Sequence, residues 1–367
     1  MTPLLNRISS TQPRTRSKSM SARIGFCINP MSGRDVRRLA GRASNMTHEA
    51  KRDMVARLAA GADALGVDEI LIVREPFSIA EKALQHMILK AKVRVLDLPV
   101  TNSAKDSENA VNAFIDLGCR TIVSLGGDGT NRAIVRSQPN INLLPISTGT
   151  NNVFPMMVEP TLVGMAASLI ANESLDELTS HALSRKVKVI RVTGQNFNDL
   201  ALVDAVLLRD DHVGNLLPFA AEKIMQLVLA RAEPDGIGMS PIGGYLDPVF
   251  CEDDFALSIK LGREGQSLKV PLSPGLFGDV TVEGTNRLEL NQSLDFLGPG
   301  VISLDGDRDH RFSSGEHAQI KVCRDGPRVF DVAAVMRAAV QAGLLIGRDS
   351  DMKTPHSDEA LLEEKSC

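Results

Sequence analysis

Between about residues 22 and 158, short apolar runs alternate with longer segments whose apolar residues recur at helical spacing. The apolar runs are hydrophobic on both faces, which is typical of strands that helices cover on both sides of a sheet. Strands that alternate with helices are joined by crossover connections and lie parallel. The sequence therefore predicts a parallel α/β sheet, with strands at 23–29, 69–73, 92–98, 120–125 and 142–147, helices at 48–66, 78–91 and 107–118, and a short helix before the last strand.

After about residue 158 the pattern becomes β-like. A helical segment at 162–172 is followed by short apolar runs that Gly, Pro, Asn and Asp separate, which predicts a mostly antiparallel β-rich domain. Two more segments have helical patterns: an insert at 215–232, and a last helix at 329–345 that could pack on either domain. The predicted units are a disordered basic tail at 1–21, an α/β domain at 22–158, a β-rich domain at 159–328, a returning helix at 329–347 and a disordered tail at 348–367.

The composition argues against several classes of partner. With 41 Lys and Arg against 45 Asp and Glu, the formal net charge is −4, so no bulk positive field attracts nucleic acid or an anionic membrane. The chain has no Trp and one Tyr, which argues against a base-stacking platform. No apolar run approaches the roughly 18 residues that span a bilayer. The five cysteines are scattered without metal-ligand spacing, and a reducing cytoplasm fits them best.

The amino-terminal end is basic and contains no acidic residue before the first predicted strand. Transit peptides share this bias, but no apolar face recurs here at helical spacing, so a disordered tail is favoured. Met20 lies directly before the first strand and offers a second translation start beside Met1.

Three glycine-containing turns follow predicted strands: INPMSGRD at 28–35, LGGDGTNR at 125–132 and ISTGTNNVF at 146–154. The carboxyl ends of parallel strands share one edge of a sheet, and ligands bind at that edge. Glycine lets backbone N–H groups approach a phosphate closely, and the N-terminus of the following helix adds a favourable dipole. A single such turn is more often a connection than a site. Three on one edge together predict a site for one polyanionic ligand.

Asp128 is an acidic residue within the second of these turns. It could be a helix N-cap, which is a common role of Asp. It could instead hold Mg²⁺ against phosphates or act as a base toward an acceptor hydroxyl. The usual nucleotide signatures are absent, since the chain contains neither a P-loop motif nor a GxGxxG that follows a strand. It also lacks a GxSxG elbow and an HExxH motif.

The chain resembles the NAD kinase and diacylglycerol kinase-like superfamily in three features: GGDGT after an apolar strand, an upstream NPMSG and a β-rich second domain. The segments GFCINPMSGRDVRRLA, GGDGTNRAIV and PISTGTNNVFP are similar to the ATP-NAD kinase-like proteins of the acetoin catabolism protein X type. The similarity covers most of residues 22–346. It implies a Rossmann-like parallel α/β nucleotide-binding domain followed by a mostly antiparallel, β-sandwich-like domain, and it implies no established reaction.

The resemblance also implies roles for particular residues. In NAD kinases the aspartate of GGDGT contacts the acceptor ribose and is the favoured base toward its 2′-hydroxyl, so Asp128 is a candidate catalytic residue. SLDGDRDHRF resembles the DGE motif of lipid kinases, where Asp307, with Asp305 beside it, is a second candidate. A tight hairpin turn is the alternative interpretation of that motif. The expected nucleotide-binding residues are Asn29, Ser32, Gly33, Gly126, Gly127, Gly129, Thr130, Thr148, Gly149, Thr150, Asn151, Asn152 and Asp204.

Two departures from NAD kinases bear on the acceptor. Those enzymes have an Asn-Glu pair that grips the nucleotide, and here Val203 replaces the Asn while Asp204 keeps the acid. The segment TGTNNVF resembles the GTxND loop of lipid kinases more than the turn that NAD kinases use. The chain therefore combines features of both branches of the superfamily.

The leading hypothesis is phosphoryl transfer from ATP, with Mg²⁺ or another divalent cation, to a hydroxyl of NAD(H) or a similar small molecule, linked to acetoin catabolism. The alternatives are a lipid or small-alcohol kinase and a non-catalytic nucleotide-binding accessory protein. A lipid acceptor would need an apolar groove or membrane-facing patch, and no basic amphipathic helix is evident. By analogy with the superfamily we expect a homo-oligomer, a dimer or tetramer, in the cytoplasm, with neither nucleic acid nor membrane as a partner.

Overall fold

The computed structural model describes residues 21–34, 45–149, 152–175 and 177–346. Apart from residue 21, the two predicted tails lie outside the described residues. Within the described ranges, no helix has the length and apolar character that crossing a membrane would require.

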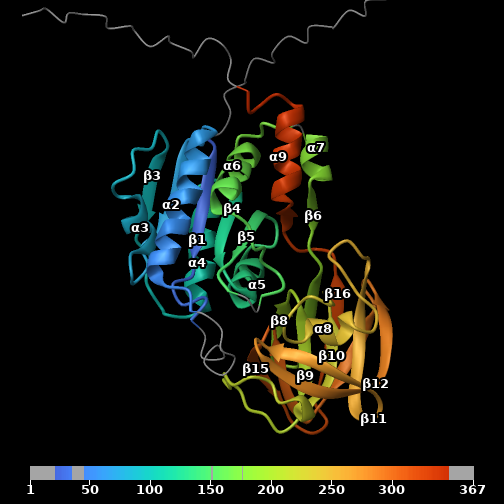
Figure 1. Ribbon diagram of the computed structural model, residues 1–367. Helices are drawn as coiled ribbons and strands as arrows, with labels where there is room; N and C mark the ends of the chain where they lie inside the picture. Colours follow the sequence, from blue (N-terminus) through green and yellow to red (C-terminus); the bar gives the residue numbers. More distant parts are fainter. Residues whose placement is uncertain (1–20, 35–44, 150–151, 176, 347–367) are drawn as a thin grey trace, which may run out of the picture.

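A seven-stranded sheet forms the amino-terminal part of the fold (Figure 1). Its strand order is β3-β2-β1-β4-β5-β17-β6, and the first six of these strands pair in parallel. Within the described strands of this sheet, only β6, at the edge, runs antiparallel to its neighbour. The strands are β1 (Arg23–Ile28), β2 (Glu69–Val73), β3 (Lys92–Leu96), β4 (Thr121–Gly126), β5 (Asn142–Ser147), β6 (Ser184–Lys186) and β17 (Arg328–Phe330). The predicted parallel α/β sheet is confirmed.

Helices cover both faces of this sheet, as its apolar strands require. One face packs against α2 (His48–Ala64), α3 (Ile79–Leu84), α6 (Pro160–Ala171) and α9 (Val332–Gln341) in a single apolar cluster. The other face packs against α4 (Ala104–Asp116) and α5 (Asp128–Ser137). A short helix, α7 (Glu177–Ala182), precedes β6.

Two antiparallel sheets form the carboxyl-terminal part and pack face to face. One has the order β12-β11-β10-β9-β14-β15 and the other β13-β16-β7-β8. Alternate residues such as Ile190, Leu207 and Ile320 fill the space between them, which confirms the expected β-sandwich-like architecture. The elements are β7 (Val189–Thr193), β8 (Asn198–Ala201), β9 (Asp204–Leu208), η1 (Ala221–Lys223), β10 (Ile224–Leu229), α8 (Ser240–Gly244), β11 (Phe255–Ser273), β12 (Leu276–Glu289), β13 (Ser293–Leu297), β14 (Gly300–Leu304), β15 (Asp307–Phe312) and β16 (His317–Cys323).

The helical insert predicted at 215–232 is wrong. This segment forms one 3₁₀ turn, η1, and then strand β10, which pairs with β9 on one side and β11 on the other. Its Ala, Glu, Lys, Met and Leu residues favour a helix, but intrinsic propensity is a weak preference. Pairing on both edges and burial of Leu227 and Leu229 in the apolar cluster that includes Ile242 of α8 outweigh that preference.

Two other helices differ from their predicted lengths. The helix predicted at 78–91 is only six residues long, ending at Leu84. The helix predicted at 329–345 begins at Val332, because Asp331 accepts a hydrogen bond from the Ala334 N–H as its N-cap. The residues just before it form β17, which pairs with β5, so α9 packs on the parallel sheet. The predicted domain boundaries stay predictions.

Helices α2 and α6 approach each other closely through glycine. A side chain at Gly164 would place its Cβ 2.1 Å from the carbonyl oxygen of Leu58, and one at Gly61 would lie as close to Thr161. Neither contact can be relieved by rotating a side chain, because both involve backbone atoms. The two helices therefore pack at a distance that only glycine allows.

Gly164→Ala is expected to lower the free energy of unfolding by about 1–3 kcal/mol, the usual cost of overpacking. Alanine has the higher helix propensity by about 1 kcal/mol, but here its Cβ would force α2 and α6 apart. Denaturant unfolding measures the change. Leu162→Ala, at an exposed position of the same helix, is the control and should alter stability by less than about 0.5 kcal/mol. A Gly164→Ala protein as stable as the wild type would contradict the close packing.

Candidate functional site

A cavity of about 800 Å³ lies between the carboxyl edge of the parallel sheet and the β-rich part. Its walls come from the segments that follow β1, β2, β3 and β4, and from β9 and the turn between β14 and β15. This is the edge at which open parallel sheets bind ligands. The predicted site residues that line it are Asn29, Ser32, Gly33, Gly127, Asp128, Gly129, Thr130, Asn152, Asp204 and Asp307.

The first and second glycine turns are bonded to each other. Asn29 donates a hydrogen bond from Nδ2 to Oγ1 of Thr130 at 2.8 Å. The Oδ1 atom of Asn29 accepts the backbone N–H groups of Met31 and Ser32. One amide side chain thus fixes its own turn and joins it to the GGDGT turn.

The first turn also lies against the third. Gly33 has a φ of +71°, and a Cβ there would lie 2.4 Å from the carbonyl oxygen of Thr148. Both the backbone conformation and the close approach therefore require glycine. The three turns that the sequence placed on one sheet edge are neighbours in the structure.

Lys51, which the sequence analysis did not identify, holds the first turn through two hydrogen bonds to its backbone. It lies on α2, is fully buried, and donates from Nζ to the carbonyl oxygens of Asn29 (2.8 Å) and Pro30 (2.6 Å). The signal was present in the sequence, because Lys51 precedes Met54 and Val55 by one helical turn and so falls on the apolar stripe of that helix.

Asp128 is not the N-cap of α5. Gly127 occupies that position, and the Asp128 carboxylate instead accepts the backbone N–H groups of Phe154 (2.9 Å) and Val153 (3.2 Å) from the third turn. Loss of contact with water and, to a smaller degree, the nearby Asp305 carboxylate raise the pKa of Asp128 to about 7, although the two N–H donors act in the opposite direction. The carboxyl group can therefore gain and lose a proton near neutral pH.

The LDGD segment is a two-residue hairpin turn, as its alternative interpretation predicted. Asp305 and Gly306 connect β14 to β15 with φ values of +48° and +91°. The Asp305 carboxylate accepts three consecutive backbone N–H groups, those of residues 202–204, at 2.8 to 3.2 Å. Loss of contact with water raises its pKa to about 6. Asp305 thus fixes the hairpin to the start of β9.

The hairpin places Asp307 over the N-terminus of α5. A Cβ built on Gly129 would lie 3.2 Å from Oδ2 of Asp307, so this glycine makes room for the carboxylate. The Asp307 side chain is 42% exposed. Asp128 and Asp307, from opposite parts of the fold, line the same cavity.

Some predicted site residues do not line the cavity. Gly126 ends β4, where a Cβ would collide with the Thr130 side chain. Thr148 and Gly149 are not among the residues that line the cavity. Thr150 and Asn151 lie outside the described residues. Val203 is buried and belongs to the apolar cluster under α4 and α5, whereas Asp204 lines the cavity.

Several apolar residues of the cavity lining are partly open to solvent, and together we call them the apolar wall. They include Met31, Phe77, Val100 and Leu216, which are all more than a third exposed. The acids, the glycines and the polar side chains of the glycine turns are the polar lining, which we call the polar wall. A ligand that carries both an anionic and a flat or apolar group matches this division.

Magnesium is the metal that phosphoryl transfer would require. Among the described residues, no three His, Cys, Asp or Glu side chains are grouped so that they could hold a metal ion. Mg²⁺ usually keeps several waters and binds through one or two carboxylates plus substrate phosphates. The residues present therefore fit an ion that would arrive with a nucleotide, and the half-exposed carboxylate of Asp307 would be its protein ligand.

Asp128→Asn should change how stability depends on pH. The pKa of Asp128 is about 7 in the folded protein and close to 3.8 in the unfolded chain, so the wild-type free energy of unfolding falls as the pH rises through this window. Asparagine does not titrate. The melting temperature of the variant should therefore rise relative to wild type between about pH 4 and pH 7 and then level off.

Thermal unfolding at intervals across that pH range measures the effect. Asp295→Asn, at an exposed position on β13, is the matched control and should show a constant difference from wild type. A constant difference for Asp128→Asn as well would contradict the raised pKa.

Comparison with known proteins gives two family matches and one curated relative. A family model described as the ATP-NAD kinase N-terminal domain matches residues 25–174, and one described as the acetoin catabolism protein X C-terminal domain matches residues 186–325. The chain is 31% identical over 329 residues to acetoin catabolism protein X of Cupriavidus necator. The alignment covers 86% of this chain and 92% of that protein.

Proposed function

This chain belongs to the family of acetoin catabolism protein X, and we propose that it is an ATP-dependent phosphotransferase that acts on a hydroxyl of NAD or a related small molecule. The observation that carries the proposal is the meeting of the GGDGT turn with acids of the β-rich part in one cavity. The name of the relative supports a further proposal, that the reaction serves acetoin catabolism.

The polar wall suits a chain of phosphates. Gly127 and Gly129 leave backbone N–H groups accessible at the N-terminus of α5, whose dipole favours negative charge. Ser32 and Asn152 add side-chain groups from the first and third turns. Most of the catalysis in phosphoryl transfer is positioning and charge neutralisation, which such an arrangement would supply.

Asp128 is the group we propose as general base. A base works best when its pKa lies near the operating pH, and a value of about 7 meets this condition. Its two backbone N–H donors would hold the carboxylate in place while it accepts the acceptor's hydroxyl proton. A magnesium ion bound with ATP would neutralise charge on the transferred phosphoryl group.

The match to the ATP-NAD kinase N-terminal domain suggests NAD as the first acceptor to consider. Val203 faces the apolar core, so the amide that grips the nucleotide in NAD kinases has no counterpart at this position. The apolar wall could instead receive a base or another flat group. We therefore propose a nucleotide-like acceptor, with NAD the first to be tested.

Asp128→Asn should reduce turnover by at least about 100-fold, within the range of a lost general base, while leaving the fold intact. A coupled assay of ADP formation with Mg²⁺ and ATP, run across NAD, NADH, acetoin and a diacylglycerol, measures it. Asp295→Asn is the control and should match the wild type. Near-normal turnover in Asp128→Asn would show that Asp128 is not the general base. Tight nucleotide binding, with no ADP formed from ATP in the presence of any of these acceptors, would favour a non-catalytic accessory protein.

A kinase for a lipid or another small alcohol is the second candidate. The exposed apolar wall, with Met31, Phe77, Val100 and Leu216, is the observation that favours it. Under the leading proposal the protein should not sediment with phosphatidylcholine vesicles that contain diacylglycerol, because a nucleotide-like acceptor requires no contact with a membrane. Sedimentation that Phe77→Ser abolishes would support the lipid acceptor instead.

A further inference from the structure

Arg132 is a buried arginine on α5, one turn after Asp128, to which the proposed chemistry assigns no role. Only 3% of its side chain is exposed. Burying a guanidinium is costly unless charges and hydrogen-bond acceptors surround it. Its partners therefore show which parts of the chain it joins.

Two of these partners are backbone carbonyl groups of the β-rich part. Nε of Arg132 donates to the Leu200 oxygen at 2.8 Å, at β8, and Nη1 donates to the Leu304 oxygen at 3.3 Å, at the end of β14. Leu304 directly precedes the Asp305–Gly306 turn. Arg132 thus connects α5 to β8 and to the start of the β14–β15 hairpin.

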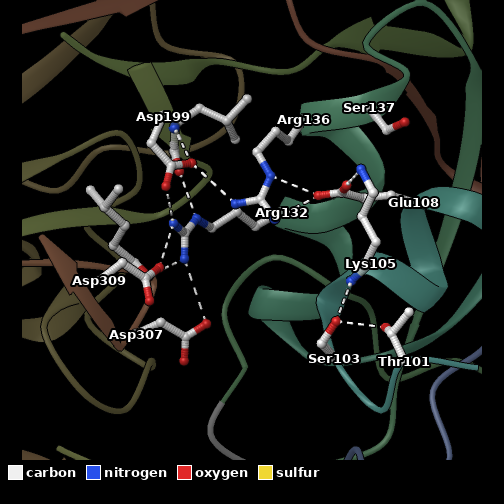
Figure 2. Close-up of polar contacts among 12 residues, drawn as sticks. Thr101, Ser103, Lys105, Glu108, Arg132, Arg136, Ser137, Asp199, Asp307 and Asp309 are labelled. Carbon is white, nitrogen blue, oxygen red and sulfur yellow. Dashed lines mark hydrogen bonds and ion pairs between the residues drawn. The ribbon is translucent and has the colours of Figure 1, made fainter. Parts of the chain in front are cut away.

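Three carboxylates complete what we call the Arg132 cluster, which consists of Arg132, Asp199, Asp307 and Asp309 (Figure 2). Nη2 donates to Asp199 at 2.7 Å and to Asp309 at 2.9 Å. Nη1 lies 3.5 Å from Oδ2 of Asp307. Figure 2 shows Asp199 above the guanidinium of Arg132 and Asp309 and Asp307 below it, with Glu108 farther away beside Arg136.

A β-bulge directs Asp309 into the cluster. In the register of β14 and β15, Ser303 pairs with Arg308 and Ile302 with His310, so Asp309 has no residue opposite it. Such an extra residue re-aims the neighbouring side chains. His310 accordingly reaches Asp199, at 3.0 Å, while Asp309 reaches Arg132.

We propose that Arg132 is a positioning residue, which holds the β14–β15 hairpin on α5 so that Asp307 and Asp128 face the cavity at a fixed separation. Its effect on catalysis rests on the proposed function, whereas its effect on the hairpin rests on the contacts alone. The geometry requires arginine. A lysine at this position would keep the charge but has no planar fork that could serve two carbonyls and two carboxylates together.

The test compares Arg132→Met and Arg132→Lys with the wild type in the same kinase assay. Arg132→Met should lower kcat about 100-fold, the effect of a displacement of about 1 Å, and should change KM for ATP less than about threefold. Arg132→Lys should recover only part of kcat, because it restores charge without the fork. Arg287→Met is the matched control, since Arg287 also pairs with a carboxylate in a forked geometry, with Asp247, remote from the cavity.

Arg132→Met leaves several buried acceptors without their partner, so a milder variant and its control accompany it.

 Asp309→Asn removes one partner of the arginine at a side chain that is 44% exposed, and Asp247→Asn is its control. Asp309→Asn should lower kcat by about tenfold and leave KM unchanged, and Asp247→Asn should do neither.

Hydrogen exchange tests the hairpin independently of catalysis. The amides of residues 202–204 are bound by Asp305, so they report how firmly the hairpin is held. They should exchange at least about tenfold faster in Asp309→Asn and in Arg132→Met than in the wild type, and at an unchanged rate in both controls.

The outcomes separate the two proposals. If the wild type transfers phosphate, an unchanged kcat in Arg132→Met and Asp309→Asn overturns the inference, and so does a rise in KM alone. If the wild type transfers phosphate to no acceptor, the proposed function fails and exchange decides: faster exchange at residues 202–204 supports the positioning role of Arg132, and unchanged exchange overturns it.

Discussion

Two carboxylates bound by backbone N–H groups hold the site together. Asp128 accepts from the third glycine turn, and Asp305 accepts from the segment that leads into β9. In each case a side chain of one segment satisfies the main chain of another, so neither segment can move without exposing unpaired polar groups. The raised pKa values of both groups show the cost of this arrangement, because each acid lies where a charge is poorly solvated.

The sequence predicted what depends on local pattern. The parallel strands and the three turns follow from period and glycine, and a hairpin at LDGD was one of the two interpretations that the sequence left open. It failed where pairing partners decide the outcome, as in β10, whose residues favour a helix but lie between two strands. The boundaries of α3 and α9 were also set by caps and turns that periodicity does not reveal.

The site residues divide in the same way. Asp128 and the glycines belong to one short motif and could be predicted. The roles of Arg132 and Lys51 depend on contacts with residues far away in the sequence, which no local pattern shows. A faint signal existed for Arg132, because it follows Asp128 by one turn and the segment DRD offers two acids close together. Nothing local indicated that a bulge would direct Asp309 toward it.

The ends of the β-rich segment meet each other. The N–H of Val187 donates to the Pro327 oxygen at 3.0 Å, and the N–H of Gly326 donates to the Val187 oxygen at 3.1 Å. Directly outside this pair, β6 and β17 run side by side in the parallel sheet. In its topology, the segment 187–327 is therefore an insertion at the edge of an α/β sheet, and its two ends lie next to each other. A short linker could join residue 186 directly to residue 328 and leave the parallel sheet continuous. The segment 187–327 could therefore be exchanged as one unit, together with its contribution to acceptor specificity.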